Sequence, residues 1–407
     1  MRLGEMVAMG LHKGFKLVLY EIKYLFRQKF LLVFTCAAVI FIFFMMRPGS
    51  YSINSSIYDS FPGYPKGEQK AFLLELAEAH PVYDIGLTEA ELSDEISIPN
   101  HEGTVTVREA LTAAHRLQTV ENAKEQREQI RLEAEQEKEE LSAEGGTDDE
   151  IKKMALIEQA YGEDVEFELY DFSGWEMYFL FMSSMQPNNF FSLIHVVIIV
   201  SAGLLVFLKD RESHTQPYLS LARYAGSGAL YAAKLAAVFV YGTVLQLCLN
   251  GIYIAYLHFV SGYDMGHWLS DICNVPRYML SEVNMSIVSL ILLNVFLKVL
   301  LSMGIVLLML LSVRVLKQYI LILIGGVGAA GALYLWLFRI CSSDKSGLAW
   351  LADPMSIFKI DYFLNSDIIE LFGAVHQTRL LFAVIWGSVL ILMVILFYKV
   401  WRWGMDE

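Results

Sequence analysis

Acidic residues are missing from every long apolar run of this 407-residue chain, although 55% of its residues are hydrophobic and 18% are charged. Carriers that are driven by protons or sodium ions use carboxylates inside the membrane to hold the coupling ion. The absence of such carboxylates argues against an ion-coupled carrier. The long apolar runs themselves predict an all-α polytopic membrane protein rather than a soluble domain.

Motifs for hydrolysis and for metal binding are also missing. The sequence contains no G-x-x-x-x-G-K-[ST] phosphate loop, and no H-E-x-x-H pair occurs among its nine scattered histidines. We therefore expect no catalytic residues, no metal site and no cofactor bound by this chain. Energy for work on a substrate would have to come from a separate partner.

Cysteine is scarce, with four in the whole chain. Cys36 and Cys248 fall inside apolar runs, where they are expected to pack as small apolar side chains. Cys273 and Cys341 fall in two segments that are predicted to lie outside the cell, where disulfides persist. These two cysteines are a candidate disulfide, and two free thiols are the alternative.

Charge is unevenly distributed along the chain, so the net charge of −13 hides two unlike parts. Residues 47–189 hold 11 Lys and Arg against 30 Asp and Glu, whereas the remainder holds 20 against 14. The sequence therefore predicts an acidic polar insert joined to a membrane body with basic edges. Neither part has the basic, aromatic-interleaved patch that is typical of nucleic-acid binding, so we expect no nucleic-acid partner.

Six apolar runs are close to the length of a transmembrane helix. The six predicted spans are residues 30–46, 190–208, 235–257, 286–311, 319–338 and 380–397. Lys and Arg are concentrated in the segments that an even number of spans would place with the two termini, and basic residues favour the cytoplasmic side. Both termini are therefore predicted to be cytoplasmic, and the acidic insert extracellular.

Residues 1–29 contain six Lys and Arg against only Glu5 and Glu21, with apolar residues at helical spacing. This pattern predicts an amphipathic helix in the membrane interface. A basic leader that only sets the topology is the alternative. Near the other end of the chain, residues 353–372 alternate apolar and polar residues, and we expect short outer helices there before the last span.

The insert, residues 47–189, is predicted to contain a helical hairpin. Helical composition covers Val107–Leu141 and Ile151–Gly162, and Gly145-Gly146 separates the two stretches. Thr147 and Glu150 have the spacing of a capping box at the start of the second helix. The residues before the hairpin, 51–100, are expected to be irregular with short helices. We interpret the hairpin as a solvated domain, and capture of a cationic peptide as the alternative.

Lys298 is the one charge well inside a predicted span, about 18 Å into the fourth at the helical rise. A buried lysine is costly in a membrane and indicates a functional site. Asn294 lies one turn away, so the two residues are candidates for a translocation pathway, a water-filled cavity or an anionic ligand. In the alternative interpretation the span begins later and Lys298 lies at the outer interface.

Residues 209–234 link the second and third predicted spans, and here a family resemblance emerges. The pattern Phe207-x-x-Asp210-Arg211-Glu212-Ser213-x-Thr215, followed by Leu219, Gly226 and Lys234, resembles the cytoplasmic loop of type-2 ABC exporter permeases. His214 stands where that family usually has a glycine, and Arg223 lies near an expected proline.

The resemblance implies a cytoplasmic coupling loop that rests on a separate ATP-hydrolysing subunit. The coupling residues would be Asp210, Arg211, Glu212, Thr215, Tyr218, Leu219, Leu221 and Arg223. The chain would then be a permease subunit in a bacterial plasma membrane, paired with a second permease subunit, with residues 1–29 as its elbow helix and residues 190–407 carrying spans two to six. ATP and Mg²⁺ would bind the partner ATPase.

The large insert after the first span looks like a subgroup of this family found in Gram-positive bacteria. By the same resemblance, the substrate would be amphiphilic, such as a peptide antibiotic or a lipid. The alternative function is a membrane-anchored receptor or scaffold, whose extracellular domain binds a partner without transport.

Overall fold

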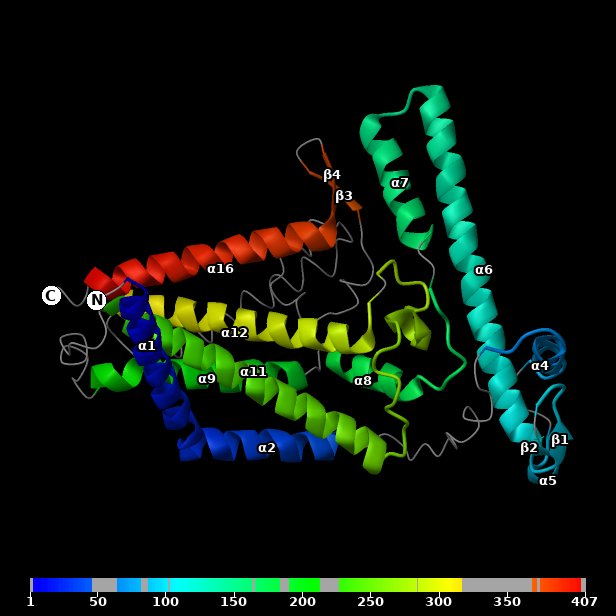
Figure 1. Ribbon diagram of the computed structural model, residues 1–407, viewed down its shortest axis with the longest axis horizontal. Helices are drawn as coiled ribbons and strands as arrows, with labels where there is room; N and C mark the ends of the chain where they lie inside the picture. Colours follow the sequence, from blue (N-terminus) through cyan, green and yellow to red (C-terminus); the bar gives the residue numbers. More distant parts are fainter. Residues whose placement is uncertain are drawn as a thin grey trace.

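The protein is mostly helical (Figure 1). The structure, a computed structural model, describes residues 3–45, 64–81, 87–101, 103–162, 165–183, 190–212, 227–283, 285–316, 368–371 and 374–403. The α-helices are α1 (Leu3–Phe26), α2 (Lys29–Met45), α4 (Glu68–Ala79), α5 (Glu89–Leu92), α6 (Val107–Glu144), α7 (Asp148–Gly162), α8 (Ser173–Ser183), α9 (Phe190–Glu212), α11 (Ser227–Phe259), α12 (Ile287–Leu316) and α16 (Thr378–Trp403). The other elements are β1 (Glu95–Ser97), β2 (Thr104–Thr106), η1 (Ile272–Asn274), η2 (Pro276–Tyr278), β3 (Ile368–Leu371) and β4 (Ala374–Gln377).

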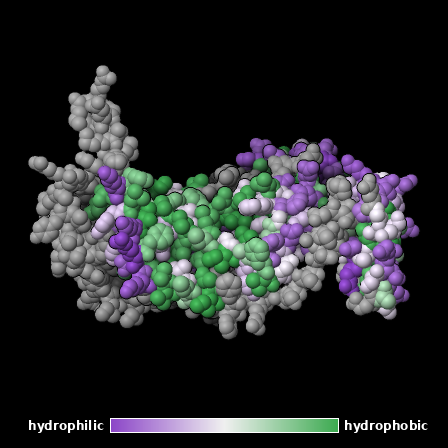
Figure 2. Space-filling model, turned by 60° about the horizontal axis from the view of Figure 1, so that its bottom comes forward, coloured by the Kyte–Doolittle hydropathy of each residue, from purple (hydrophilic) through white to green (hydrophobic). Residues whose placement is uncertain are grey.

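The apolar helices α2, α9, α11, α12 and α16 form one elongated body, with α12 in contact with α9, α11 and α16. Figure 2 shows an extensive apolar surface over this body and a hydrophilic surface toward the hairpin end. Leu230–Phe259 in α11 and Ile287–Leu310 in α12 are long and apolar enough to cross a membrane. By length and composition, these two helices confirm the third and fourth predicted spans.

The other four predicted spans differ in what the structure describes. Shorter apolar helical stretches, Val197–Phe207 and Gly387–Leu396, lie within the second and sixth. The first corresponds to α2, a helix of 17 residues. The fifth, residues 319–338, lies outside the described residues.

The basic N-terminal segment forms the predicted helix, α1, which packs against α11 (Figure 1). Its direction differs strongly from that of α2, and the chain changes direction through a turn at Arg27 and Gln28. Leu25 is buried in the contact, and the Phe26 ring lies 5.3 Å from that of Tyr241, edge to face. Phe15 remains exposed. The helix therefore lies across the bundle rather than continuing α2.

The predicted helical hairpin is confirmed by α6 and α7. Gly145 ends α6 with a φ of 77°, a left-handed conformation that glycine adopts without a steric penalty. Thr147 accepts a hydrogen bond from the Glu150 amide, and the Glu150 carboxylate accepts one from the Thr147 amide, which completes the predicted capping box. An ion pair between Lys138 and Glu158 joins the two helices.

Two β-hairpins correct the all-α prediction. Strands β1 and β2 pair antiparallel, with Ile96 opposite Val105. Strands β3 and β4 pair antiparallel, with Ile369 opposite His376. The expectation of short helices over residues 353–372 is wrong where the structure describes that segment, since residues 368–371 form β3. The neighbouring isoleucines of β3 are β-branched and favour a strand over a helix.

The segment between α11 and α12 docks on the insert, so the apolar body and the hairpin share one packed region. The guanidinium of Arg116 on α6 donates to the Asn274 carbonyl oxygen at 2.6 Å. About three turns further along α6, Arg127 donates to the Ser281 carbonyl oxygen at 2.6 Å. The Asn274 side chain in turn accepts from the Glu168 amide at 2.6 Å. We call the described residues of the insert, together with residues 260–283 between α11 and α12, the outer region.

A charged cluster fixes α4 against α6. The Glu121 carboxylate accepts hydrogen bonds from Lys70 at 2.5 Å, from Lys124 at 3.2 Å and from the Tyr64 hydroxyl. Burial by itself raises the pKa of the Glu121 carboxyl, but the hydrogen bonds from Lys70, Tyr64 and Lys124 together lower it to about 2.

We expect acid to weaken this cluster. The depressed pKa of Glu121 stabilises the folded state at pH values above the ordinary carboxyl pKa of 4.5, and this contribution is lost as the pH falls toward 2. Glu121→Gln should remove about 1–2 kcal/mol at neutral pH, because it loses charge-assisted hydrogen bonds. Hydrogen exchange of α4 amides between pH 5 and 2 measures both effects. Glu125→Gln, at an exposed position one turn along, is the control, and equal α4 exchange in the two variants would contradict the assignment.

Candidate functional site

The interior of the apolar body contains a polar stripe on α12. Asn294, Lys298 and Ser302 are spaced four residues apart, so they share one face of the helix, and all three are buried. The Ser302 hydroxyl donates to the Lys298 carbonyl oxygen at 2.7 Å. The opposite face exposes the apolar side chain of Phe296. Helix α12 therefore directs its polar stripe to the interior, together with apolar residues such as Val295 and Val299.

Lys298 is the central residue of this stripe. Its side chain is 0% exposed, and it lies in the middle of the apolar segment Ile287–Leu310. Burial of Lys298 within a long apolar helix favours a place inside the span, and the alternative interpretation, in which the span begins later and the lysine lies at an interface, stays a prediction. The helix is continuous from Ile287, so the lysine is several turns inside it.

Helices α9 and α11 supply polar side chains next to the stripe. His195 of α9 and Gln246 of α11 are both 0% exposed, and His195 Nδ1 lies 2.7 Å from Gln246 Oε1. Because an amide oxygen only accepts, Nδ1 is the donor in this hydrogen bond. Lys298 lies close enough for its charge to act on the His195 ring. We call His195, Gln246, Asn294 and Lys298 the polar cluster.

Hydrogen bonds continue from the polar cluster toward the outer region. Asn250 donates from Nδ2 to the Gln246 carbonyl oxygen at 2.6 Å and accepts from the Tyr178 hydroxyl at 2.6 Å. Tyr178 belongs to α8, which lies in the insert between α7 and α9, and its ring stacks on that of Tyr253 at 5.7 Å. A chain of polar contacts therefore connects α8 to the centre of the bundle.

Close packing of α9, α11 and α12 surrounds the polar cluster. A Cβ atom at Gly203 of α9 would lie 2.6 Å from a methyl group of Val306 on α12. A Cβ atom at Gly242 of α11 would lie 3.3 Å from Ile199 on α9. Missing side chains at these two glycines let the helix backbones approach. The cluster is thus surrounded by closely packed helices.

Three nitrogen donors in this environment have no hydrogen-bond partner among the residues that the structure describes. They are Lys298 Nζ, Asn294 Nδ2 and Gln246 Nε2. Each of them can donate and none can accept. Leaving such groups unpaired away from water costs free energy, and the cost is largest for a charged ammonium. The arrangement is suited chemically to binding an acceptor that carries negative charge.

The coupling residues are only partly within the described residues. Asp210, Arg211 and Glu212 form the last helical residues of α9. Thr215, Tyr218, Leu219, Leu221 and Arg223 lie outside the described residues. The two ends of the family-like pattern do come together, because Lys234 Nζ lies 5.6 Å from the centre of the Phe207 ring.

Lys234 lies at the edge of an apolar run, a position that predicts a side chain at the membrane edge. Its environment in the structure is different. Its side chain is fully buried, and its ammonium donates to the Val206 carbonyl oxygen at 2.6 Å. This hydrogen bond fastens the beginning of α11 to the last turns of α9.

Cys273 is buried, and its sulfur lies 3.9 Å from Nη1 of Arg127. Cys341 lies outside the described residues, so its pairing with Cys273 stays a prediction. Cys36 and Cys248 are exposed rather than packed in a core. Within the part of the chain that the structure describes, no group of three or more His, Cys, Asp or Glu side chains is arranged to hold a metal ion.

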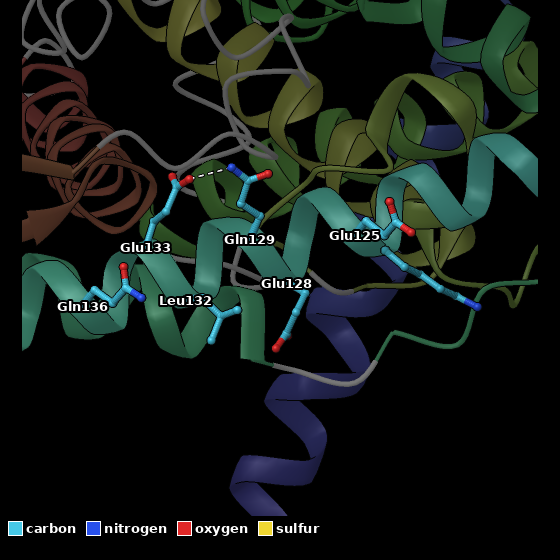
Figure 3. Close-up of a pocket in the computed structure, with 7 residues that line it drawn as sticks. Glu125, Glu128, Gln129, Leu132, Glu133 and Gln136 are labelled. Carbon is cyan, nitrogen blue, oxygen red and sulfur yellow. Dashed lines mark hydrogen bonds between the residues drawn. The ribbon is translucent and has the colours of Figure 1, made fainter.

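An open hollow of about 590 Å³ follows one side of α6 (Figure 3). The residues that line it are Lys124, Glu125, Glu128, Gln129, Leu132, Glu133 and Gln136. Gln129 donates to Glu133 at 2.7 Å, so part of its polar surface is satisfied internally. The hollow is open and lined by residues of a single helix, in keeping with a solvated helix face.

Residues that the sequence did not single out make up half of the polar cluster. His195 and Gln246, like Asn250, are isolated polar residues within apolar runs. That contrast with their neighbours is a signal in the sequence, but it does not reveal that His195 bonds to Gln246 or that its ring lies near Lys298. Buried Arg116 and Arg127 lie in a stretch rich in charge, where nothing in the sequence distinguishes them from solvated arginines.

The architecture defines a broad class: a predominantly helical protein with two described helices that are long and apolar enough to cross a membrane, and with a polar cluster between them. No protein-family model, curated protein or solved structure matches the chain. Function must therefore be argued from the residues themselves.

Proposed function

We propose that this chain is the permease subunit of an ATP-driven ABC-type exporter that moves an amphiphilic substrate. The observation that carries the proposal is the polar cluster around Lys298. A fully buried lysine in the middle of a long apolar helix is expensive, and such residues commonly belong to substrate or ion pathways. Polar side chains from α9 and α11 gather at the same place, as expected for a pathway between helices.

The proposed arrangement in the membrane has six spans, with both termini in the cytoplasm. Both chain ends lie at the end of the helical body that is remote from the α6–α7 hairpin, which supports an extracellular hairpin (Figure 1). The orientation of α1 across α11 supports its role as an interfacial elbow helix. A second permease subunit, identical or related, would complete the transporter in a bacterial plasma membrane.

The proposed coupling site is the segment after α9. Helix α9 carries Asp210 to Glu212 at its C-terminal end, and the Lys234 contact fastens α11 to the same end of α9. A segment between two helices that are joined in this way can transmit force by docking on a partner. ATP and Mg²⁺ would bind the separate ATPase, and this chain would supply the docking surface.

We expect the double change Tyr218→Ala, Leu219→Ala to release the ATPase subunit. An aromatic and aliphatic anchor at a contact often contributes about 2 kcal/mol or more, which corresponds to at least a tenfold loss of affinity. The measurement is recovery of an ATP-binding subunit with the tagged, detergent-solubilised chain from its native membrane. Glu212→Ala should have a milder, salt-dependent effect.

Leu132→Ala is the matched control, because it shortens an exposed leucine on the hairpin, away from the coupling segment. Undiminished recovery with the double variant would remove the coupling segment from the mechanism. Failure of the unaltered chain to recover any ATP-binding subunit would contradict the exporter and favour a receptor or scaffold. The hydrogen-bonded connection from Tyr178 to His195 gives that second function a route from the outer region to the bundle.

A further inference from the structure

We infer that the polar cluster is a binding site for an anionic oxygen group, a phosphate or a carboxylate. The inference rests on the proposed function only in naming this group as part of the exported substrate. The binding site itself is argued from the donors of the polar cluster.

Donors without acceptors are the first argument. Lys298, Asn294 and Gln246 each present a buried nitrogen that lacks a hydrogen-bond partner among the described residues. Asn294 and Lys298 are one turn apart on the same face of α12. Gln246 is held by its hydrogen bond to His195, whose ring lies within the influence of the Lys298 charge. One ligand with several acceptor oxygens could accept from this set.

The balance of charge is the second argument. The six predicted spans contain no Asp or Glu, so a carboxylate at the depth of Lys298 is not available from them. An isolated ammonium in an apolar medium gives up its proton unless an opposite charge is present. An anion that enters the cluster restores that opposite charge and accepts charge-assisted hydrogen bonds, which are stronger than neutral ones.

The surroundings point to an amphiphile. Val299, next to Lys298, is fully buried, and on its outer side α12 exposes Leu292 and Phe296. The apolar surface that a lipid tail would need is present on α12, on the face directed away from the polar stripe. A lipid headgroup and a small free anion share the same chemistry at the cluster, so the experiment must separate them.

The test uses the purified full chain in phosphatidylcholine nanodiscs. The probes are phosphatidylglycerol mixed into the nanodiscs and inorganic phosphate in solution, and the readouts are the thermal unfolding midpoint and binding of fluorescent phosphatidylglycerol. We expect phosphatidylglycerol, but not additional phosphatidylcholine, to raise the unfolding midpoint. Lys298→Met should weaken binding at least tenfold, while Lys298→Arg should retain part of it.

The unfolding temperature in the absence of the anion is an independent test of the environment of Lys298. Replacing a buried, uncompensated charge with an apolar side chain of similar length is neutral or stabilising, so Lys298→Met in pure phosphatidylcholine should unfold at or above the wild-type temperature. If Lys298 instead has a structural partner, the same variant should unfold at a lower temperature. Lys138→Met, on the solvated hairpin, controls for loss of a surface lysine and should leave binding unchanged.

Equal responses to phosphatidylglycerol and phosphatidylcholine, or unchanged binding in Lys298→Met, would overturn the site. A response to inorganic phosphate alone would identify a small anion as the ligand, whereas a response only to phosphatidylglycerol would identify a headgroup. Anion binding without recovery of an ATPase would retain the site and reject the exporter. Recovery of an ATPase without anion binding would retain the exporter and reject the binding site.

Discussion

Arg127→Ala is expected to lower the free energy of unfolding of the outer region by about 3 kcal/mol or more. Arg127 is buried and donates from Nη1 to the Ser281 carbonyl oxygen at 2.6 Å and to that of Met279 at 3.4 Å. Its guanidinium also lies 5.1 Å from the centre of the Tyr161 ring on α7. Truncation leaves carbonyl oxygens without their charged donor and removes one of the contacts between the hairpin and the segment before α12.

Hydrogen exchange of amides in residues 272–281, together with thermal unfolding, measures this loss. Arg131→Ala is the matched control, because Arg131 is one turn further along α6 and makes only surface ion pairs with Glu128 and Glu135. Exposed pairs of this kind contribute between 0 and about 1 kcal/mol. Equal destabilisation by the two changes would show that the buried hydrogen bonds of Arg127 do not hold the hairpin in place.

Gly203→Val is the second change with a large expected effect, because it would force α9 and α12 apart. A Cβ atom at this position would already lie 2.6 Å and 2.8 Å from the two methyl groups of Val306, closer than carbon atoms pack. Overpacking of a tight interior costs about 1–3 kcal/mol, and valine adds two methyl groups to the clash. We expect a loss at the upper end of this range, measured by denaturant unfolding of the detergent-solubilised chain.

The controls for Gly203 follow from the same geometry. Gly251→Ala on α11 should be neutral or slightly stabilising, because a Cβ there meets no atom within 4 Å and alanine favours a helix over glycine. Val306→Ala should restore much of the stability of a Gly203→Ala variant by removing the two methyl groups that clash. Additive effects of these last two changes would mean that the two helices do not meet at this point.

The features that the sequence predicted well are those encoded by neighbouring residues. The hairpin follows from a helical composition, from Gly145 at a left-handed position and from the capping box of Thr147 and Glu150, all of which act within a few residues. The α11 and α12 spans follow from the length of their apolar runs. Lys298 was found because it is a single charge in such a run.

The features that the sequence did not predict depend on contacts between distant residues. Lys234 was expected at the edge of the membrane, but packing against α9 buries it with its ammonium on the Val206 carbonyl oxygen. The hydrogen bond from Arg116 to Asn274 joins residues 158 positions apart. In β3 the alternation of apolar and polar residues is too short to separate a strand from a helix, and pairing with β4 decides the outcome.

Helix α6 is attached near its middle, so it can pivot about this attachment as a rigid rod. Arg116 and Arg127 hold it to the segment between α11 and α12, while α4 packs on one side of this attachment and α7 follows the other end (Figure 1). At the helical rise, about 21 Å separates Val107 from Glu121, which lies between the two arginines, and about 35 Å separates Glu121 from Glu144. Any tilt of the α11–α12 segment would therefore move the two ends of α6 in opposite directions, with roughly 1.6 times the travel at the hairpin turn.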